Sequence, residues 1–267
     1  MHFPFFEDIL SQVIITENRN ATKPGELFSG SLTLYLKERG RFSSMEMNDV
    51  ESQVLAKVYE ELQQRYVGFD DAAHGWEHIE RVYKLALSIA EQENADLLIV
   101  GMAVLMHDLG HLSSDTSLHH ADLSMSMAGE ILLAYDVSAG TREAILHAIA
   151  AHSFSLGIEP RTLEARIVRD ADRLDSLGAI GILRWAITGA LRRTGETQTY
   201  HPVDPFAEWH TLDDRRYMLD HFFAKLLKLD GTMATQTGRA LAQERTVFMR
   251  TYLNEFRKEL SEAIINT

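Results

Sequence analysis

The chain has 267 residues, of which 45% are hydrophobic and 24% are charged, as is usual for a soluble globular protein with one large or two small domains. Its 26 Lys and Arg face 39 Asp and Glu, and this net charge of −13 argues against a protein that coats nucleic acid by neutralising phosphates. The absence of cysteine excludes disulfides, iron–sulfur clusters and thiolate zinc sites, so any metal must be held by His, Asp, Glu or water.

Residues 1–47 do not share the pattern of the rest of the chain. Turn-forming residues are scattered through the segment, and only Leu32–Leu36 resembles a strand, without an obvious partner. We therefore expect a poorly ordered N-terminal extension. The segment has no basic start, and Glu7 and Asp8 interrupt its apolar residues, so we expect no secretory signal. Leu97–Met106, the longest apolar run, is about half of what a bilayer span needs. We expect a cytoplasmic protein that does not bind membranes.

From residue 48 the apolar residues recur at helical spacing, which predicts an all-α domain over residues 48–264. The expected helices are 50–66, 76–91, 95–107, 119–135, 141–152, 161–190 as one or two helices, 212–229 and 235–260. The helix at 95–107 is apolar nearly all round, which indicates a buried central helix. Residues 110–118 and 193–211 are expected loops, and loops as long as the second are often functional.

Histidine and carboxylate side chains recur at the ends and inner faces of these helices, where burial without a partner would be costly. His107 and Asp108 come directly after the central apolar run. His78 lies one short turn into the helix after it enters from a loop containing His74, and Asp172 lies within an apolar frame that turns it inward. A His–His–Asp–Asp set without sulfur suits Mn²⁺, Fe²⁺, Co²⁺, Ni²⁺ or Zn²⁺ rather than Ca²⁺.

Each member of this set also has a structural explanation. A His–Asp dipeptide arises easily by chance in a chain with 12 His. Asp172 and Asp175 could cap a helix or form salt bridges with Arg169 and Arg173. The hypothesis of a metal site therefore depends on the whole set rather than on any one residue.

Four segments together resemble a known family. They are His74–Val82 (HGWEHIERV), Leu105–Gly110 (LMHDLG), Asp170–Gly181 (DADRLDSLGAIG) and His221–Leu227 (HFFAKLL). Over roughly residues 50–260 the chain resembles the HD-domain metal-dependent phosphohydrolases, and in particular their small single-domain bacterial subgroup. Some members of that subgroup are manganese-dependent nucleotide pyrophosphohydrolases. The resemblance implies a compact helical bundle and an enzyme.

The family's metal ligands would correspond to His78, His107, Asp108 and Asp172 of this chain. The resemblance implies a divalent metal at these residues, with Mn²⁺ expected and Fe²⁺, Co²⁺, Ni²⁺, Zn²⁺ or Mg²⁺ as alternatives.

Three further histidines have candidate roles. His111 stands where relatives often place a Glu or another polar group that contacts the attacking water or the phosphate, so it could act as an acid, a base or a phosphate contact. Some HD enzymes bind two metals, and His120 and His152 are candidate ligands of a second ion. His119 and His120 could equally be ordinary residues of a helix face.

Phosphoryl transfer needs positive charge besides the metal, because charge accumulates on the transferring oxygens. Arg173 could orient Asp172 or contact a phosphate, and we group it with His111 and Asp108 as a catalytic candidate. The candidate substrate contacts are His74, Lys225, Lys228, Arg239 and Arg245. A solvated helix face is the competing interpretation for each basic residue.

The sequence predicts a small phosphorylated substrate, a nucleotide rather than a nucleic-acid polymer. The expected reaction converts an NTP or dNTP to the monophosphate and pyrophosphate by a metal-activated water. A phosphomonoesterase or phosphodiesterase of the 5′-nucleotidase or cyclic-nucleotide type is an alternative, because the pocket walls rather than the metal site decide the substrate. A non-catalytic HD-like regulatory module is a third possibility, but it predicts missing ligands, and none of the four is missing.

Overall fold

The computed structural model describes residues 47–115, 117–153 and 156–265 of the chain. All regular structure in these ranges is helical, apart from one isolated bridge between Gln198 and Tyr217. This finding confirms the predicted all-α class. The expected N-terminal extension and the possible strand Leu32–Leu36 lie outside the described residues.

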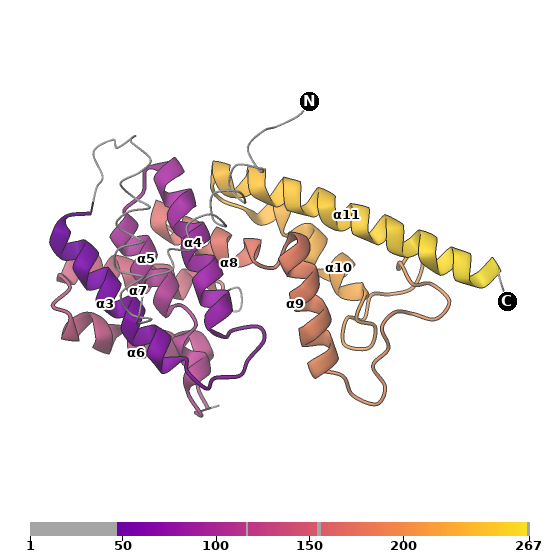
Figure 1. Cartoon of the computed structure of the whole chain (residues 1–267), viewed down its shortest axis with the longest axis horizontal. Coiled ribbons are helices and arrows are strands. Elements are labelled where there is room, and N and C mark those ends of the chain that lie inside the picture. Colours follow the sequence, from indigo (N-terminus) through magenta and orange to yellow (C-terminus); the bar gives the residue numbers. More distant parts are fainter. Residues whose placement is uncertain (1–46, 116, 154–155, 266–267) are drawn as a thin grey trace, which may run out of the picture. The chain divides into compact units, whose positions relative to one another are not determined.

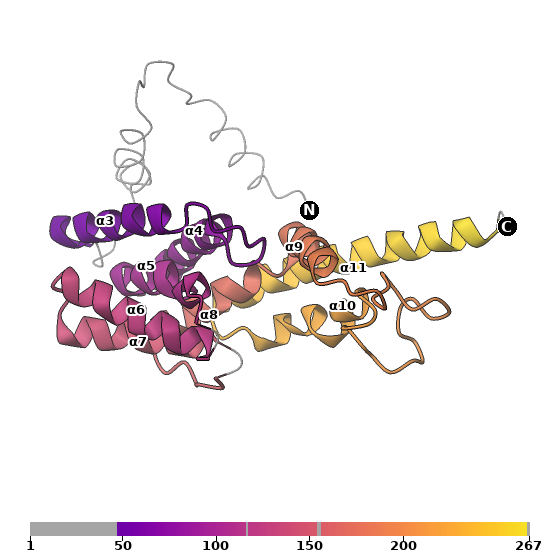
Figure 2. The same ribbon diagram turned by 90° about the horizontal axis from the view of Figure 1, so that it is seen from below.

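The helices succeed one another along the chain with short connections until residue 191 (Figures 1 and 2). In chain order they are α3 (Asp49–Arg65), α4 (Trp76–Glu93), α5 (Leu97–Met106), the 3₁₀ turn η1 (Leu109–Leu112), α6 (His120–Ala134), α7 (Ala139–His152), α8 (Leu163–Leu174), α9 (Gly178–Leu191), α10 (Asp220–Ala224), the 3₁₀ turns η2 (Leu226–Lys228) and η3 (Asp230–Thr232), and α11 (Gln236–Ile265).

Polar side chains set the start of several helices. Asn48 and Glu51 form a reciprocal capping box at the start of α3, and Asp96 accepts an early backbone N–H of α5. The helix expected from residue 141 begins earlier, because Ser138 accepts the backbone N–H of Thr141 and caps α7.

Helix α5 is the centre of the core, as predicted. Every residue from Val100 to Met106 is buried, and α5 packs against α3, α4, α6, α7 and α8 (Figure 1). Each large apolar side chain buried in this way contributes roughly 1.5–3 kcal/mol to the free energy of unfolding. His107 and Asp108 come directly after the C-terminal end of this buried helix.

The predicted helical region 161–190 is two helices, α8 and α9, with axes bent by 65°. Gly178 comes after the break with φ of +72°, a left-handed conformation that favours glycine. Within the described ranges no single helix is long and apolar enough to cross a bilayer, and only this bent pair meets the length and composition criterion jointly.

The helix predicted over 212–229 was wrong in its first half. The chain stays irregular until Leu219, and only the short helix α10 and the 3₁₀ turns η2 and η3 come between this point and α11. Asp213 accepts the backbone N–H groups of Arg215 and Arg216, which ties the segment into a turn. Side-chain bonds of this kind compete with the helical backbone pattern.

A buried carboxylate ties α11 to the rest of the fold. Asp170 of α8 accepts the backbone N–H groups of Ala234 and Thr235 and the hydroxyl of Thr235, just before α11 begins. Helix α11 also packs against α4 and α9. These contacts fix the C-terminal half of α8, which carries Asp172.

Candidate metal centre

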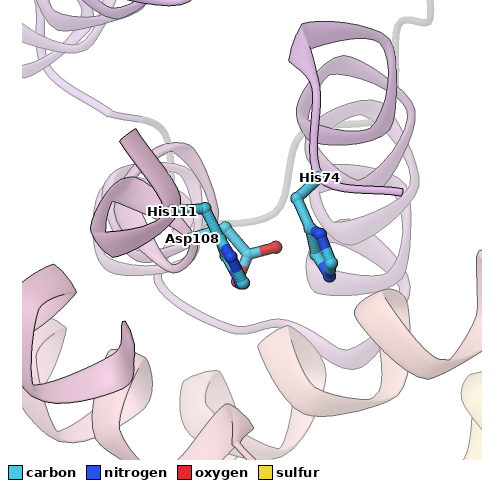
Figure 3. A group of neighbouring side chains, drawn as sticks. All are labelled: His74, Asp108 and His111. Carbon is cyan, nitrogen blue, oxygen red and sulfur yellow. The ribbon is translucent and has the colours of Figure 1, made fainter. Parts of the chain in front are cut away.

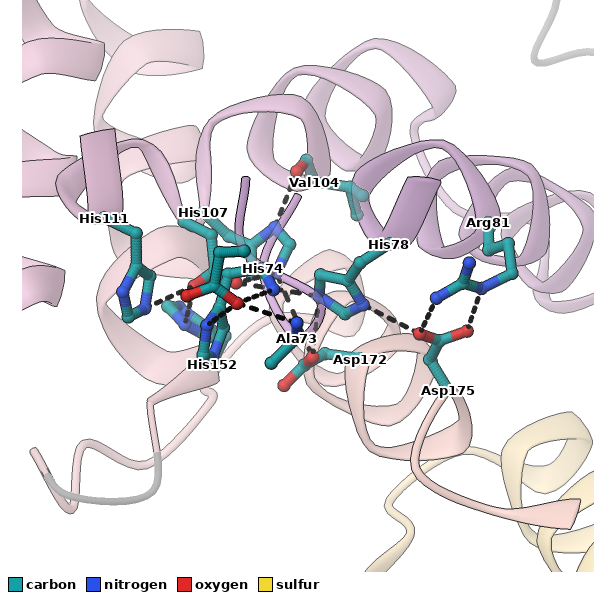
Figure 4. Close-up of polar contacts among 12 residues, drawn as sticks. Ala73, His74, His78, Arg81, Val104, His107, His111, His152, Asp172 and Asp175 are labelled. Atoms are coloured by element: carbon teal, nitrogen blue, oxygen red, sulfur yellow. Dashed lines mark hydrogen bonds and ion pairs between the residues drawn. The ribbon is translucent and has the colours of Figure 1, made fainter. Parts of the chain in front are cut away.

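The four predicted ligands meet where α5 ends, α4 begins and α8 passes, and Figure 4 labels His78, His107 and Asp172 among them. His78 Nε2 lies 3.6 Å from Asp108 Oδ2 and 3.5 Å from Asp172 Oδ1. His107 Nε2 lies 3.4 Å from Asp108 Oδ2 and 3.9 Å from Asp172 Oδ1. The consecutive helices α4 and α5 and the more distant α8 therefore bring two imidazole nitrogens and two carboxylates together.

The histidines are oriented by bonds on their outer nitrogens. His107 Nδ1 lies 2.7 Å from the main-chain carbonyl one turn earlier, and His152 makes the equivalent contact in α7. His78 Nδ1 lies 2.8 Å from Asp175 Oδ2. A hydrogen bond donated by Nδ1 leaves the lone pair on Nε2, so all three Nε2 atoms can act as ligands.

His78, His107 and Asp108 are buried and Asp172 is partly buried, and their charges suit a cation. Burial alone favours the neutral acid of Asp108, yet the imidazoles of His107, His152 and His78 hold the pKa of that carboxyl well below its usual range. Burial lowers the pKa of His107. Burial opposes the charged form of His78, but Asp108 and Asp175 outweigh it and raise its pKa to about 9. Without a metal, the centre thus holds an ionised Asp108 beside a protonated His78, and a bound cation would take the place of the His78 Nε2 proton.

One atom in the described part of the chain shows directly whether these residues could hold a divalent cation. His107 Nε2 is buried and has no hydrogen-bond partner among the described residues. An orphaned nitrogen of this kind is costly unless something fills the space that it faces. A divalent cation held by His78, His107, Asp108 and Asp172 would satisfy it, and a set of two imidazoles and two carboxylates suits such an ion.

A second group of histidines lies near Oδ1, the other carboxylate oxygen of Asp108. His111 Nε2 lies 3.8 Å from Asp108 Oδ1, and its ring stacks on His74 at 4.0 Å (Figure 3). The ring of His120 stacks on His111 at 4.6 Å. Burial lowers the pKa of His111 to about 4, so this imidazole is neutral at pH 7.

The two candidate ligands of a second ion also lie here. His152 Nε2 is 3.6 Å from Asp108 Oδ1, and ligand atoms of Asp108, His120 and His152 all lie within 4.8 Å of one another. His78 and His107 therefore approach Oδ2 of Asp108, whereas His111 and His152 approach Oδ1. The central carboxylate has histidines on both oxygens.

Within the described residues, the predicted basic contacts form no hydrogen bond or ion pair with the four cluster residues, although Arg173 interacts electrostatically with Asp172. Arg173 donates to the carbonyl of η3 at 3.1 Å, and Arg245 donates to the carbonyl at the end of α8 at 2.6 Å. Arg239 donates to carbonyls just before α11, and Lys225 and Lys228 are exposed. Their roles toward a substrate stay predictions.

Sequence reasoning missed the partners of Asp175. It assigned this carboxylate to capping or to the neighbouring arginines of its own helix. Instead Asp175 contacts His78, Arg81 and Arg184, from α4 and α9. The available signal was the spacing, because Asp172 and Asp175 lie three apart on one helix face.

Comparisons with known proteins give the family of the chain. Residues 75–177, which contain all four candidate ligands, match the HD domain family. The protein YpgQ of Bacillus subtilis (strain 168) is 35% identical over 196 residues, which cover 72% of this chain and 86% of YpgQ. The chain belongs to the HD superfamily.

Solved structures of HD proteins have the same fold. The crystal structure of Bacillus subtilis YpgQ in complex with ADP aligns with a TM-score of 0.61 and 33% identity, covering 79% of this chain and 96% of that one. An HD-superfamily hydrolase from Bacillus thuringiensis aligns with a TM-score of 0.62 and 30% identity, covering 79% and 98%. This HD protein is a hydrolase of the metal-dependent phosphohydrolase class, and its HD domain implies a divalent metal.

Proposed function

We propose that this HD protein hydrolyses nucleoside triphosphates to the monophosphate and pyrophosphate with Mn²⁺ at His78, His107, Asp108 and Asp172. The observation that carries the proposal is the orphaned His107 Nε2, which faces two carboxylates and a second imidazole. A cation held by these four residues would polarise a phosphoryl oxygen and lower the pKa of a water molecule.

His111 is proposed to contact the phosphoryl group. Its ring lies beside Asp108 Oδ1 and is stacked on His74, which restricts its orientation. Because its pKa is lowered to about 4 by burial, it is a weak base at pH 7. It acts as a neutral hydrogen-bond donor toward a phosphate oxygen rather than as a cation.

Asp108, His120 and His152 are proposed to hold a second, weaker cation. Support comes from the spacing of their ligand atoms and from His152 Nε2 at 3.6 Å from Asp108 Oδ1. Titration with Mn²⁺ monitored by electron paramagnetic resonance measures the stoichiometry. Two ions per chain that fall to one in His120→Ala are expected, whereas one ion in both proteins would contradict this second site.

The nucleotide part of the proposal is supported by YpgQ, which was solved in complex with ADP and is 33% identical. The purified protein is incubated with Mn²⁺ and a panel of NTPs, dNTPs, monophosphates and cyclic nucleotides, and the products are separated. The expected products are monophosphate and pyrophosphate from triphosphates. Release of orthophosphate only, or cleavage confined to monophosphates or cyclic nucleotides, would identify a phosphomonoesterase or phosphodiesterase instead.

A further inference from the structure

Asp175 is not one of the four candidate ligands, yet it contacts one of them on its outer side. Its Oδ2 lies 2.8 Å from His78 Nδ1, and its side chain is only 5% exposed. We propose that Asp175 is a positioning residue that holds His78 with its proton on Nδ1 and its Nε2 facing the metal. This inference rests on the proposed metal site but not on the identity of the substrate.

Two arginines hold the Asp175 carboxylate in one orientation. Arg81 of α4 binds it through two atoms, with Nε 2.9 Å from Oδ1 and Nη2 3.0 Å from Oδ2 (Figure 4). Arg184 of α9 places Nη1 2.9 Å from Oδ2. A two-point guanidinium contact fixes the plane of a carboxylate as well as its position. The direction of the bond to His78 is therefore set by residues of α4 and α9.

His78 differs from the other histidines of the centre in what holds it. His107 and His152 use main-chain carbonyls of their own helices, which no substitution removes. His78 relies on a side chain from α8, and that acceptor carries a charge. A carboxylate acceptor makes the opposite nitrogen of an imidazole a stronger metal ligand than a neutral acceptor does. His78 is therefore the ligand whose strength depends on a single distant residue.

The same network reaches the loop that precedes α4. Arg184 Nη2 donates to the carbonyl of Ala73 at 2.6 Å, next to His74. His74 in turn stacks on His111 at 4.0 Å. One arginine of α9 thus contacts both the carboxylate behind His78 and the loop that carries His74. This double contact explains why the apolar helix α9 has its single charged residue at position 184.

The test compares Asp175→Asn with Asp220→Asn in the full chain. Asp220 is a matched control, because it is also a fully buried carboxylate bound to a histidine, with Oδ2 2.9 Å from His210 Nε2, and it lies outside the centre. Affinity for Mn²⁺ is measured by isothermal titration without any nucleotide. Asp175→Asn is expected to weaken Mn²⁺ binding by about 10- to 100-fold, as substitutions behind metal ligands do. Asp220→Asn is expected to leave it unchanged.

A second readout separates positioning from plain stability. Nitrogen-15 NMR of the metal-free protein, recorded at a pH above the His78 pKa of about 9, reports which ring nitrogen of neutral His78 carries the proton, with His78→Gln assigning the signal. The signal of His78 is expected to change in Asp175→Asn and to stay as in the wild type in Asp220→Asn. A folded Asp175→Asn protein with wild-type Mn²⁺ affinity and an unchanged His78 signal would overturn the proposal.

If Asp175→Asn does not fold, Arg184→Lys tests the same network with the carboxylate in place. Lysine retains the charge but cannot contact Asp175 and the Ala73 carbonyl together, so weaker Mn²⁺ binding is expected. Unchanged Mn²⁺ affinity in this variant overturns the proposal. Absence of triphosphate cleavage leaves these results untouched, because every measurement is made without a nucleotide.

Discussion

Two clusters of histidine and aspartate in this molecule have nearly the same composition and opposite designs. The first is the metal-centre cluster, made of His78, His107, Asp108 and Asp172. The second is the loop cluster, made of His201, Asp204, His210 and Asp220, in and after the long loop that comes after α9.

The loop cluster satisfies its own bonding groups. Asp204 accepts the backbone N–H groups of residues 208–210, and its Oδ2 lies 2.8 Å from His210 Nδ1. The other nitrogen of His210 lies 2.9 Å from Asp220 Oδ2. With both ring nitrogens occupied, His210 has no lone pair to offer a metal.

The metal-centre cluster leaves one inner nitrogen without a hydrogen-bond partner and holds the other only by long contacts. Nδ1 of His78 and of His107 is bonded on the outside, and His107 Nε2 has no hydrogen-bond partner within the described ranges. Two carboxylates face these nitrogens at 3.4–3.9 Å, longer than a good hydrogen bond. Residue types alone therefore do not mark a metal site, whereas unsatisfied ligand atoms that converge do.

The largest effect is expected from a substitution of Asp108, the carboxylate at the middle of the metal-centre cluster. Asp108→Asn removes the anion that lies near His78, His107 and His152, so Mn²⁺ binding and hydrolysis should fall by more than about 100-fold. Titration calorimetry and the product assay measure the two losses. Asp204→Asn is the matched control in the loop cluster and should retain Mn²⁺ binding. Retention of activity in Asp108→Asn would contradict the assignment of Asp108 to the metal centre.

The second largest effect is expected from a substitution in the loop cluster. Asp220→Asn removes one of the two charged partners of His210 at a fully buried position, which should cost about 3 kcal/mol in the free energy of unfolding. Urea unfolding of the metal-free protein measures this loss. Loss of stability without loss of Mn²⁺ affinity would separate the two clusters, while loss of both would show that they act as one unit.

A smaller effect concerns pH. Burial opposes the charged form of His210, but Asp220 and Asp204 raise the pKa of His210 above its usual 6.5. Because the folded state binds this proton more tightly than the unfolded state, protonated His210 stabilises the fold. The contribution to the free energy of unfolding is full below about pH 6.5 and is lost as the pH rises through the higher pKa of His210 in the folded state.

The comparison of wild type with His210→Gln isolates this contribution, because His78 titrates in the same direction in both proteins. The difference in the free energy of unfolding should be largest below pH 6.5 and shrink as the pH rises. A difference that does not vary with pH between 6 and 9 would contradict the charged state of His210.

The smallest effect is expected from removal of the N-terminal residues, which tests the domain assignment. We propose that residues 48–264 form the complete HD domain, so a chain that begins at Met47 should bind Mn²⁺ as tightly as the full chain. Titration calorimetry of the two chains makes the comparison. A large loss of affinity in the shorter chain would place part of the centre's support within residues 1–46.

Much of the helical core and the composition of the metal-centre cluster could be predicted from local pattern. The apolar run of α5 predicts a buried helix, and His107 and Asp108 at its end must then lie in the core. Asp172 is predicted by helical periodicity in α8. These inferences succeed because the periodicity of one helix fixes which of its residues face inward.

Long-range partners and irregular segments could not be predicted in this way. Asp175 contacts Arg81 from another helix, and its contact with Arg184 depends on the 65° bend between α8 and α9. Residues 212–219 have a helical composition, but Asp213 and Asp220 accept backbone N–H groups and hold the segment irregular. Such contacts depend on tertiary placement rather than on periodicity.

Whether the metal-centre cluster holds a divalent cation can be seen in an anomalous-scattering map from crystals of the protein grown with Mn²⁺. We expect a strong peak at about 2 Å from His78 Nε2, His107 Nε2 and carboxylate oxygens of Asp108 and Asp172. A map with no peak among these four residues, or with its strongest peak elsewhere, would show that the cluster is not the metal site.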